Sequence, residues 1–160
     1  MNILFERGTI YTVYFIEKWR SVRVEKEYFM SKLEEARAFF SKDLYASELT
    51  GIEIIEAEEG HAKCSLKIED KHKNALGHVM GGVFFTMADY AFAIASNFNQ
   101  PATVTQTSQI MYLSAVKGTT LYAETEKIRA GRKTCFYKIM ITDDTGADIA
   151  YVTTTGYVVG

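Results

Sequence analysis

The chain has few cysteines and little net charge, and both shortages exclude classes of protein. Its two cysteines, Cys64 and Cys135, stand far apart, and neither belongs to a Cys-x-x-Cys or Cys-x-x-His spacing. The sequence therefore predicts neither a disulfide framework nor a structural zinc site. Eighteen lysines and arginines face twenty aspartates and glutamates, which gives a formal net charge of −2. Without an overall positive field, we expect neither nucleic acid nor an acidic membrane as a partner.

Long hydrophobic runs are also missing. The longest run, residues 83–96, contains Asp89, and it is shorter than the roughly 20 apolar residues that a membrane span needs. A shorter run over residues 10–16 follows Glu6 and Arg7 and has no small-residue cleavage pattern after it, unlike a signal peptide. We therefore expect a chain that neither crosses a bilayer nor is exported, in a reducing, cytoplasmic location.

The motifs of several enzyme classes are absent as well. No serine stands in a Gly-x-Ser-x-Gly element, and neither a P-loop nor a Gly-x-Gly-x-x-Gly fingerprint occurs. These absences argue against serine hydrolase chemistry and nucleotide hydrolysis. Asp70, His72 and His78 could in principle gather a metal, but their spacing in a polar loop is not that of a known metal site. We predict no metal ion and no cofactor.

The sequence divides into an N-terminal extension, residues 1–29, and a domain, residues 30–160. The extension is rich in aromatic and charged residues and has no lasting period. Directly after Met30, a capping box at residues 31–34 precedes apolar residues at helical spacing: Leu33, Ala36, Phe40 and Leu44. Because the codons of residues 25–27 are purine-rich at ribosome-site distance, we predict that translation starts at Met30. The alternative is a genuine arm that packs on the domain or on a partner.

Periodicity within the domain predicts two helices and six strands. After the first helix come a hairpin, made by residues 51–57 and 61–68, and then a loop and a long helix over residues 82–98. This second helix is apolar nearly all round, so we expect it to be buried. Four strand-like runs with short turns follow: 102–114, 119–130, 134–143 and 147–159. The order α-β-β-α-β-β-β-β predicts an α+β domain whose last four strands form an antiparallel meander.

Three features around the start of the long helix could carry chemistry. Asp89 is a carboxylate in an otherwise apolar helix, so it is either a hydrogen-bonded structural residue or a group for acid–base work. The Gly81–Gly82 pair either exposes N–H groups to an oxyanion or phosphate, or simply allows tight packing. Asn74 either orients a water molecule or forms a turn. The residues alone leave each alternative open.

Taken together, these residues resemble a known signature. Residues 74–82, Asn-Ala-Leu-Gly-His-Val-Met-Gly-Gly, are followed by Asp89 and a tail of small residues. This pattern is similar to the signature of hotdog-fold acyl-CoA thioesterases of the phenylacetic-acid-degradation (PaaI-like) type. The resemblance runs over residues 30–159, leaves out residues 1–29, and implies an antiparallel sheet wrapped around a long central helix. It also implies a homodimer joined edge to edge through the sheets, with shared active sites, and often a homotetramer.

The resemblance implies roles for individual residues in hydrolysis of an acyl- or aryl-acyl-CoA. The N–H of Gly81 would polarise the thioester carbonyl, Asn74 would place substrate or water, and Asp89 of the opposite subunit would act as base or nucleophile. One departure is Met80, where the family commonly has histidine. Histidine-assisted steps are therefore not assumed, which also argues against the alternative of a hotdog hydratase or dehydratase. A second alternative is a non-catalytic acyl-CoA-binding protein.

Further residues are assigned to substrate and coenzyme A. Gly82 would lie beside the substrate, and Thr105 would supply a hydroxyl that Thr107 or Ser108 could replace in another register. A basic turn would meet the coenzyme A phosphates, or else is only a solvated turn; its residues are Gly131, Arg132 and Lys133, with Lys127 and Arg129 nearby. Five side chains of the long helix either line an acyl tunnel or form core: Phe84, Phe85, Met87, Tyr90 and Phe92.

Overall fold

The computed structural model describes residues 31–159. The extension predicted over residues 1–29, with its start at Met30 or its role as an arm, lies outside the described residues. A helix over residues 31–40 opens the described part, and a π-helical turn, η1 (Tyr45–Thr50), follows. No helix among the described residues is both long and apolar enough to cross a membrane.

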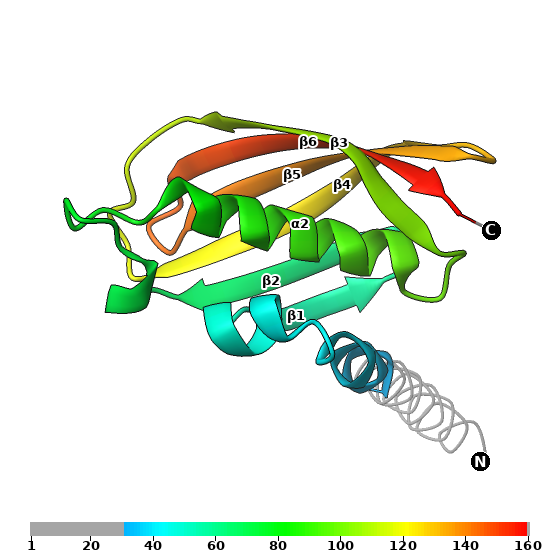
Figure 1. The fold of residues 1–160 in the computed structure, drawn as a ribbon, viewed down its shortest axis with the longest axis horizontal. Coiled ribbons are helices and arrows are strands. Elements are labelled where there is room, and N and C mark those ends of the chain that lie inside the picture. Colours follow the sequence, from blue (N-terminus) through cyan, green and yellow to red (C-terminus); the bar gives the residue numbers. More distant parts are fainter. Residues whose placement is uncertain (1–30, 160) are drawn as a thin grey trace, which may run out of the picture.

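Six strands form one antiparallel sheet in the order β1-β2-β4-β5-β6-β3. Their bounds are β1 Glu53–Glu58, β2 His61–Lys67, β3 Thr103–Tyr112, β4 Thr120–Ala130, β5 Thr134–Asp143 and β6 Asp148–Val158. Figure 1 shows the long helix α2 (Gly81–Asn97) lying lengthwise over one face of this sheet. The predicted α+β class, an antiparallel sheet around a central helix, is confirmed.

The predicted meander is wrong for one strand. β4, β5 and β6 follow one another as expected, but β3 pairs with β6 and lies at the edge of the sheet. The connection from β3 to β4 must therefore pass the ends of β6 and β5. The carboxylate of Asp143, at the end of β5, holds this connection by accepting the N–H groups of Lys117 (3.0 Å) and Gly118 (2.9 Å).

The first described helix differs from its prediction at both ends. Ser31 is already helical, so it is not the residue that caps the helix, and Glu34 accepts a hydrogen bond from Arg37 at 3.0 Å. The apolar face packs as expected, since Phe40 is buried and its carbonyl accepts the hydroxyl of Tyr90 at 3.2 Å. Leu44 is 57 % exposed because the regular helix has already ended.

Helix α2 packs one side onto the sheet and leaves a stripe uncovered. Its buried side includes Met87, Phe92 and Ile94, which are at most 1 % exposed. Gly156 of β6 makes this close packing possible, because a Cβ there would lie only 2.7 Å from the ring of Phe92. A stripe along the other side stays partly or fully exposed: Gly82, Phe85, Thr86, Asp89 and Ala93. The expectation that this helix is buried all round is therefore wrong for that stripe.

Candidate active site

The loop before α2 is shaped by the side chain of Asn74. Its Oδ1 accepts the N–H groups of Leu76 at 2.9 Å and His78 at 3.1 Å, and its own N–H donates to the His78 carbonyl at 2.8 Å. Asn74 is thus a turn former, one of the two alternatives that the sequence left open. Because the turn uses only Oδ1, the Nδ2 amide has no partner among residues 31–159 and can still donate to a ligand.

A buried histidine ties this loop to the rest of the domain. Nδ1 of His72 accepts the N–H of Glu69 at 2.9 Å, and its Nε2 lies 2.8 Å from the carbonyl of Thr50. The carbonyl of His72 in turn accepts the N–H of Met80 at 2.9 Å. With both ring nitrogens engaged and only 3 % of the residue exposed, His72 positions the loop that leads into α2.

The start of α2 presents N–H groups without a capping side chain. Met80 occupies the N-cap position and makes no side-chain cap hydrogen bond, and its carbonyl accepts the N–H of Val83 at 2.9 Å. The N–H groups of Gly81 and Gly82 belong to the first turn, which has no intrahelical acceptors for them, and the helix dipole adds partial positive charge there. This end of the helix can therefore receive an oxyanion.

Met80 does not replace histidine as a packed residue. It is 54 % exposed, and its methyl group lies beside Gly82, where an added Cβ would be 3.4 Å from it. The loop is held by backbone hydrogen bonds and by the isolated bridge between Lys73 and Val79. The side chain of Met80 is therefore free to contact a ligand near the glycine pair.

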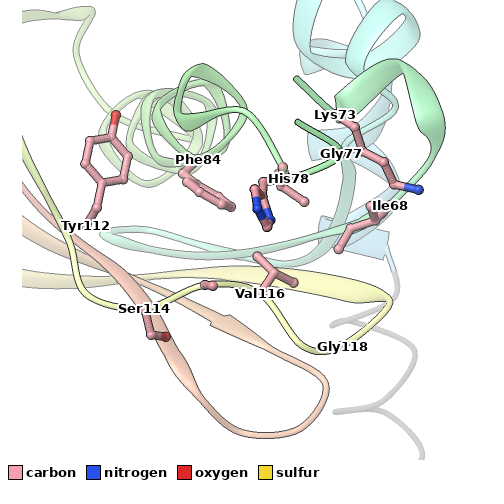
Figure 2. A pocket seen from close by; sticks show the side chains of 11 residues that line it. Ile68, Lys73, Gly77, His78, Phe84, Tyr112, Ser114, Val116 and Gly118 are labelled. Carbon is pink, nitrogen blue, oxygen red and sulfur yellow. The ribbon is translucent and has the colours of Figure 1, made fainter. Parts of the chain in front are cut away.

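Beside the glycine pair lies a pocket of about 230 Å³. Figure 2 shows His78 pointing into it, between Phe84 of α2 and the connection that carries Val116. Tyr112, at the end of β3, closes one side, and its hydroxyl is so near Gly81 that a Cβ there would lie 2.9 Å away. Tyr112 is a candidate site residue for which no role was predicted from the sequence, although it lies within residues 30–159, over which the family resemblance runs.

Asp89 lies on the uncovered stripe of α2, eight residues after Gly81. It is exposed, and its Oδ1 accepts the hydroxyl of Thr105 at 3.1 Å. The expected burial of the helix therefore does not extend to Asp89, and its hydrogen bond leaves both alternatives, a structural residue or an acid–base group, open. Ser108, one of the alternatives to Thr105, shares a hydrogen bond of 2.9 Å with Thr154 of β6 instead.

A second cleft, of about 440 Å³, opens beside Asp89. One wall is α2, and the other is formed by the end of the connection after the first helix and the start of η1. The lining residues are Asp43, Leu44, Tyr45, Ala46, Phe85, Thr86, Asp89, Tyr90 and Ala93. Of the five proposed tunnel residues, Phe85 and Tyr90 line this cleft and Phe84 the first pocket, while Met87 and Phe92 are core. No sequence pattern indicated Asp43 or Tyr45, because Asp43 is a polar position between the apolar residues Phe40 and Leu44, and Tyr45 follows the last of them.

Within one chain the glycine pair and Asp89 are not brought together. Eight residues of helix separate Gly81 from Asp89, which corresponds to about 12 Å along the axis at 1.5 Å per residue. Of the glycine pair, Gly82 lines a hollow that adjoins the cleft beside Asp89 but does not include that carboxylate. One carbonyl group could not contact the Gly81 N–H and the Asp89 carboxylate of the same chain.

The basic turn lies at the far end of the domain. Gly131 and Arg132 line a small pocket of about 130 Å³ together with Ser96 near the end of α2. The ammonium of Lys133 lies 5.9 Å from the ring of Tyr157. The basic cluster predicted from sequence is split, because the side chain of Lys127 lies over Gly60 of the β1–β2 turn, so close that a Cβ there would meet its Nζ at 2.5 Å.

The two cysteines, Cys64 and Cys135, are both buried and offer no nucleophile. Burial raises the pKa of Cys64 to about 12, and it also raises the pKa of Cys135. Both thiols are therefore protonated at neutral pH. Neither cysteine is therefore a candidate for covalent chemistry.

Sequence comparison identifies the family. The model of the thioesterase superfamily matches residues 76–150. The acyl-coenzyme A thioesterase PaaI of Escherichia coli is 31 % identical over 118 residues, 73 % of this chain and 84 % of that protein. The chain belongs to the thioesterase superfamily. An Archaeoglobus fulgidus protein named as a candidate esterase is 31 % identical to this thioesterase over 126 residues, 78 % of this chain and 82 % of its relative.

Solved structures agree with this assignment. E. coli PaaI aligns with this thioesterase at a TM-score of 0.75 and 25 % identity, over 82 % of this chain and 96 % of that chain. A hypothetical thioesterase of Streptococcus pneumoniae, solved with coenzyme A, aligns at 0.70 and 27 % identity, over 76 % and 97 % of the two chains. Two variant structures of an S. pneumoniae protein with the same name carry alanine for an aspartate and for a threonine. Those two positions are as far apart in its sequence as Asp89 and Thr105 are here.

Proposed function

We propose that this thioesterase hydrolyses the thioester of an acyl- or aryl-acyl-CoA to the free acid and coenzyme A. The observation that carries the proposal is an exposed carboxylate, Asp89, held by Thr105, in a chain whose α2 also presents the uncapped N–H groups of Gly81 and Gly82. The name of the E. coli relative and the coenzyme A in the S. pneumoniae structure support acyl-CoA as the substrate class.

Each group has a role that its geometry permits. The N–H of Gly81 would donate to the carbonyl oxygen and stabilise the negative charge that develops when the carbonyl carbon is attacked. Asp89 would either take a proton from the attacking water or attack the carbonyl itself, forming an acyl anhydride that water then cleaves. In both routes the C–S bond breaks, coenzyme A leaves as its thiol after protonation, and one water is consumed. The Nδ2 amide of Asn74 would position the substrate or the water.

A relative supports the proposed role of Asp89. The S. pneumoniae variants replace an aspartate and a threonine at the same sequence separation as Asp89 and Thr105, and here these two side chains are hydrogen-bonded at 3.1 Å. Those structures are 29 % identical to this chain, with TM-scores of 0.65. We infer that Thr105 orients the carboxylate by donating to Oδ1, which leaves the other oxygen for chemistry.

Because one chain cannot complete the site, we propose a homodimer joined through β3. This strand is ten residues long and lies at the sheet edge, where unpaired backbone groups favour pairing with another strand. Large apolar side chains on and just after it are half exposed: Val104 50 %, Met111 50 %, Tyr112 58 % and Leu113 51 %. A partner would cover them. Two such dimers could form the tetramer that the family resemblance implies without changing this site.

The register of that pairing would bring the separated groups together. In this proposal β3 pairs with its copy in the antiparallel direction over its full length. Thr103 then lies opposite the partner's Tyr112, and Ile110 lies opposite the partner's Thr105. The partner subunit's Asp89, bonded to the partner's Thr105, then lies near Ile110. Ile110 is two residues from Tyr112, or about 7 Å at 3.4 Å per residue, and the hydroxyl of Tyr112 lies against Gly81.

The same pairing would place the basic turn near the glycine pair. Within a chain, the carbonyl of Lys133 accepts the N–H of Val158, and Val158 lies opposite Thr103 at the start of β3. The start of the partner's β3 meets the end of this chain's β3, next to Gly81. The partner subunit's Arg132 and the partner subunit's Lys133 would then lie on the side from which a coenzyme A nucleotide could approach.

The test is hydrolysis of a panel of acyl-CoA thioesters, followed by detection of free thiol. The wild type should release thiol, and Asp89→Asn, which keeps the shape of the side chain, should lower kcat at least about a hundredfold, the usual scale for a positioned base. Asp148→Asn, which removes an exposed carboxylate at the start of β6, is the matched control and should leave kcat unchanged. Near-normal turnover by Asp89→Asn would remove Asp89 from the mechanism. Coenzyme A binding without turnover of any thioester would instead support the non-catalytic alternative.

A further inference from the structure

The cleft beside Asp89 has the position and walls of a site for the acyl group. It shares Asp89 with the proposed reaction centre, so an acyl chain whose carbonyl carbon is near this carboxylate can extend directly into it. Its walls are mostly apolar, with Leu44 and Tyr45 facing Phe85 and Ala93 across the opening. At about 440 Å³ it lies within the ordinary range of small-molecule sites. We call it the acyl cleft.

The charges that line the acyl cleft are all negative. The carboxylates among its lining residues are those of Asp43 and Asp89. Burial raises the pKa of Tyr90, with smaller contributions from Cys64 and Asp43, so its phenol remains neutral. Within residues 31–159, no lysine, arginine or histidine lines the acyl cleft.

Two basic side chains close to the acyl cleft in sequence or in the adjoining hollow have other partners. The ammonium of Lys42, next to Asp43 in sequence, lies 5.4 Å from the ring centroid of Phe39. Lys71, which lines the adjoining hollow beside Gly82, is paired with Glu69 at 3.4 Å. An anionic group inside the acyl cleft would therefore meet two carboxylates and no counter-charge, and it would lose hydration against apolar walls.

Resting on the proposed function, we propose that the substrates are thioesters of compact, uncharged acyl groups, and that Asp43 is a specificity residue that excludes acyl groups ending in a carboxylate. Asp43 suits this role because its side chain makes no hydrogen bond or ion pair among the described residues. Its carbonyl, by contrast, accepts the N–H groups of Ala46 (3.0 Å) and Ser47 (2.9 Å). Replacing the carboxylate by an amide removes the charge while these backbone contacts remain.

The experiment compares two thioesters of equal chain length, pentanoyl-CoA and glutaryl-CoA, which differ only by a terminal carboxylate. We expect the wild type to favour pentanoyl-CoA at least about tenfold in kcat/KM, the sum of lost hydration and repulsion. Asp43→Asn should lower this ratio about threefold by raising kcat/KM for glutaryl-CoA while leaving kcat/KM for pentanoyl-CoA unchanged. A threefold change is the effect expected from removing one charge about 6 Å away in water. Asp43→Glu keeps the charge and should keep most of the discrimination.

Glu48→Gln is the matched control, because this substitution removes one exposed charge from η1 at a residue that does not line the acyl cleft. Its ratio should equal that of the wild type. A second measurement uses the wild type alone at increasing ionic strength. Salt screens the repulsion between carboxylates, so the ratio of kcat/KM for pentanoyl-CoA to that for glutaryl-CoA should fall. Equal rates for the two thioesters, or an unchanged ratio in Asp43→Asn, would overturn the inference while leaving the thioesterase proposal intact. Hydrolysis of neither thioester, nor of any other acyl-CoA, would count against the proposed function itself.

Discussion

A site shared between two subunits predicts that two inactive variants can restore each other. The first variant is Asp89→Asn, which keeps an intact loop and glycine pair. The second combines Asn74→Ala with Gly81→Ala, which keeps an intact Asp89. The added Cβ at residue 81 would meet the hydroxyl of Tyr112 at 2.9 Å, so the methyl group also disturbs the position where the carbonyl oxygen would bind. Each variant alone should be close to inactive.

The expected recovery follows from counting sites. After free exchange of equal amounts, about half of the dimers are hybrids. In each hybrid one site combines the intact glycine pair of the first variant with the intact Asp89 of the second, and the other site has both defects. About a quarter of the sites should therefore be active, and thiol release should return to about a quarter of the wild-type rate.

The assay needs independent proof that subunits exchange. Subunits with two distinguishable affinity tags can be mixed, and the doubly tagged dimers purified before their activity is measured. Purified hybrids should then reach about half of the wild-type rate, since each has one intact site of two. Verified hybrids without activity would refute the shared site, because each hybrid contains one intact Gly81 and one intact Asp89 on different subunits. Catalysis would then need both groups from the same chain, although they lie about 12 Å apart along α2. A monomer with full activity would refute it equally.

Two further predictions concern the basic turn and the connection after β3. Replacing Arg132 and Lys133 by alanine should raise KM for acyl-CoA several-fold and hardly change KM for a short thioester without the nucleotide, because only the nucleotide end carries phosphates; equal effects on both would indicate a structural turn. Hydrogen bonds from the Thr145 hydroxyl and then the Lys117 N–H hold the pKa of Asp143 below its usual range, so its ionised form stabilises the fold above about pH 4, and this stabilisation is lost as the pH falls. Asp143→Asn should have a lower Tm than the wild type at neutral pH, and the difference in Tm should shrink below about pH 4. A difference in Tm that stays constant with pH would contradict this reasoning.

Local pattern was sufficient for the elements but not for their neighbours. The predicted helix over 82–98 corresponds to α2 within one residue at each end, and the hairpin and the later strands lie where their alternation indicated. Strand order was not encoded in turn length. A connection of a few residues, 113–119, can either turn back or cross the sheet end, and the choice depends on the carboxylate of Asp143, which comes much later in the chain.

The candidate site shows the same division between local and distant information. The Asn74 turn is written in a short segment, and its hydrogen bonds join residues at most four apart. The bond between Thr105 and Asp89 joins two elements whose relative placement depends on the whole sheet. For that reason the family resemblance indicated Thr105, while composition and periodicity could not. Asp43 and Tyr45 lack any periodic signal, and only the packing of their segment on α2 brings them to the cleft.

The error about Asp89 carries information about the assembly. An apolar helix with one carboxylate was expected to be buried on nearly every side, yet Phe85, Asp89 and Ala93 lie on a stripe that residues 31–159 leave partly or fully exposed. An exposed helix face that carries apolar side chains is suited to contact with another molecule. A second copy joined at β3 would lie on the Thr105 side of that stripe. Asp89 would then lie at the boundary between two subunits. A thioester bound there would meet the carboxylate of one subunit and the oxyanion donor, the N–H of Gly81, of the other.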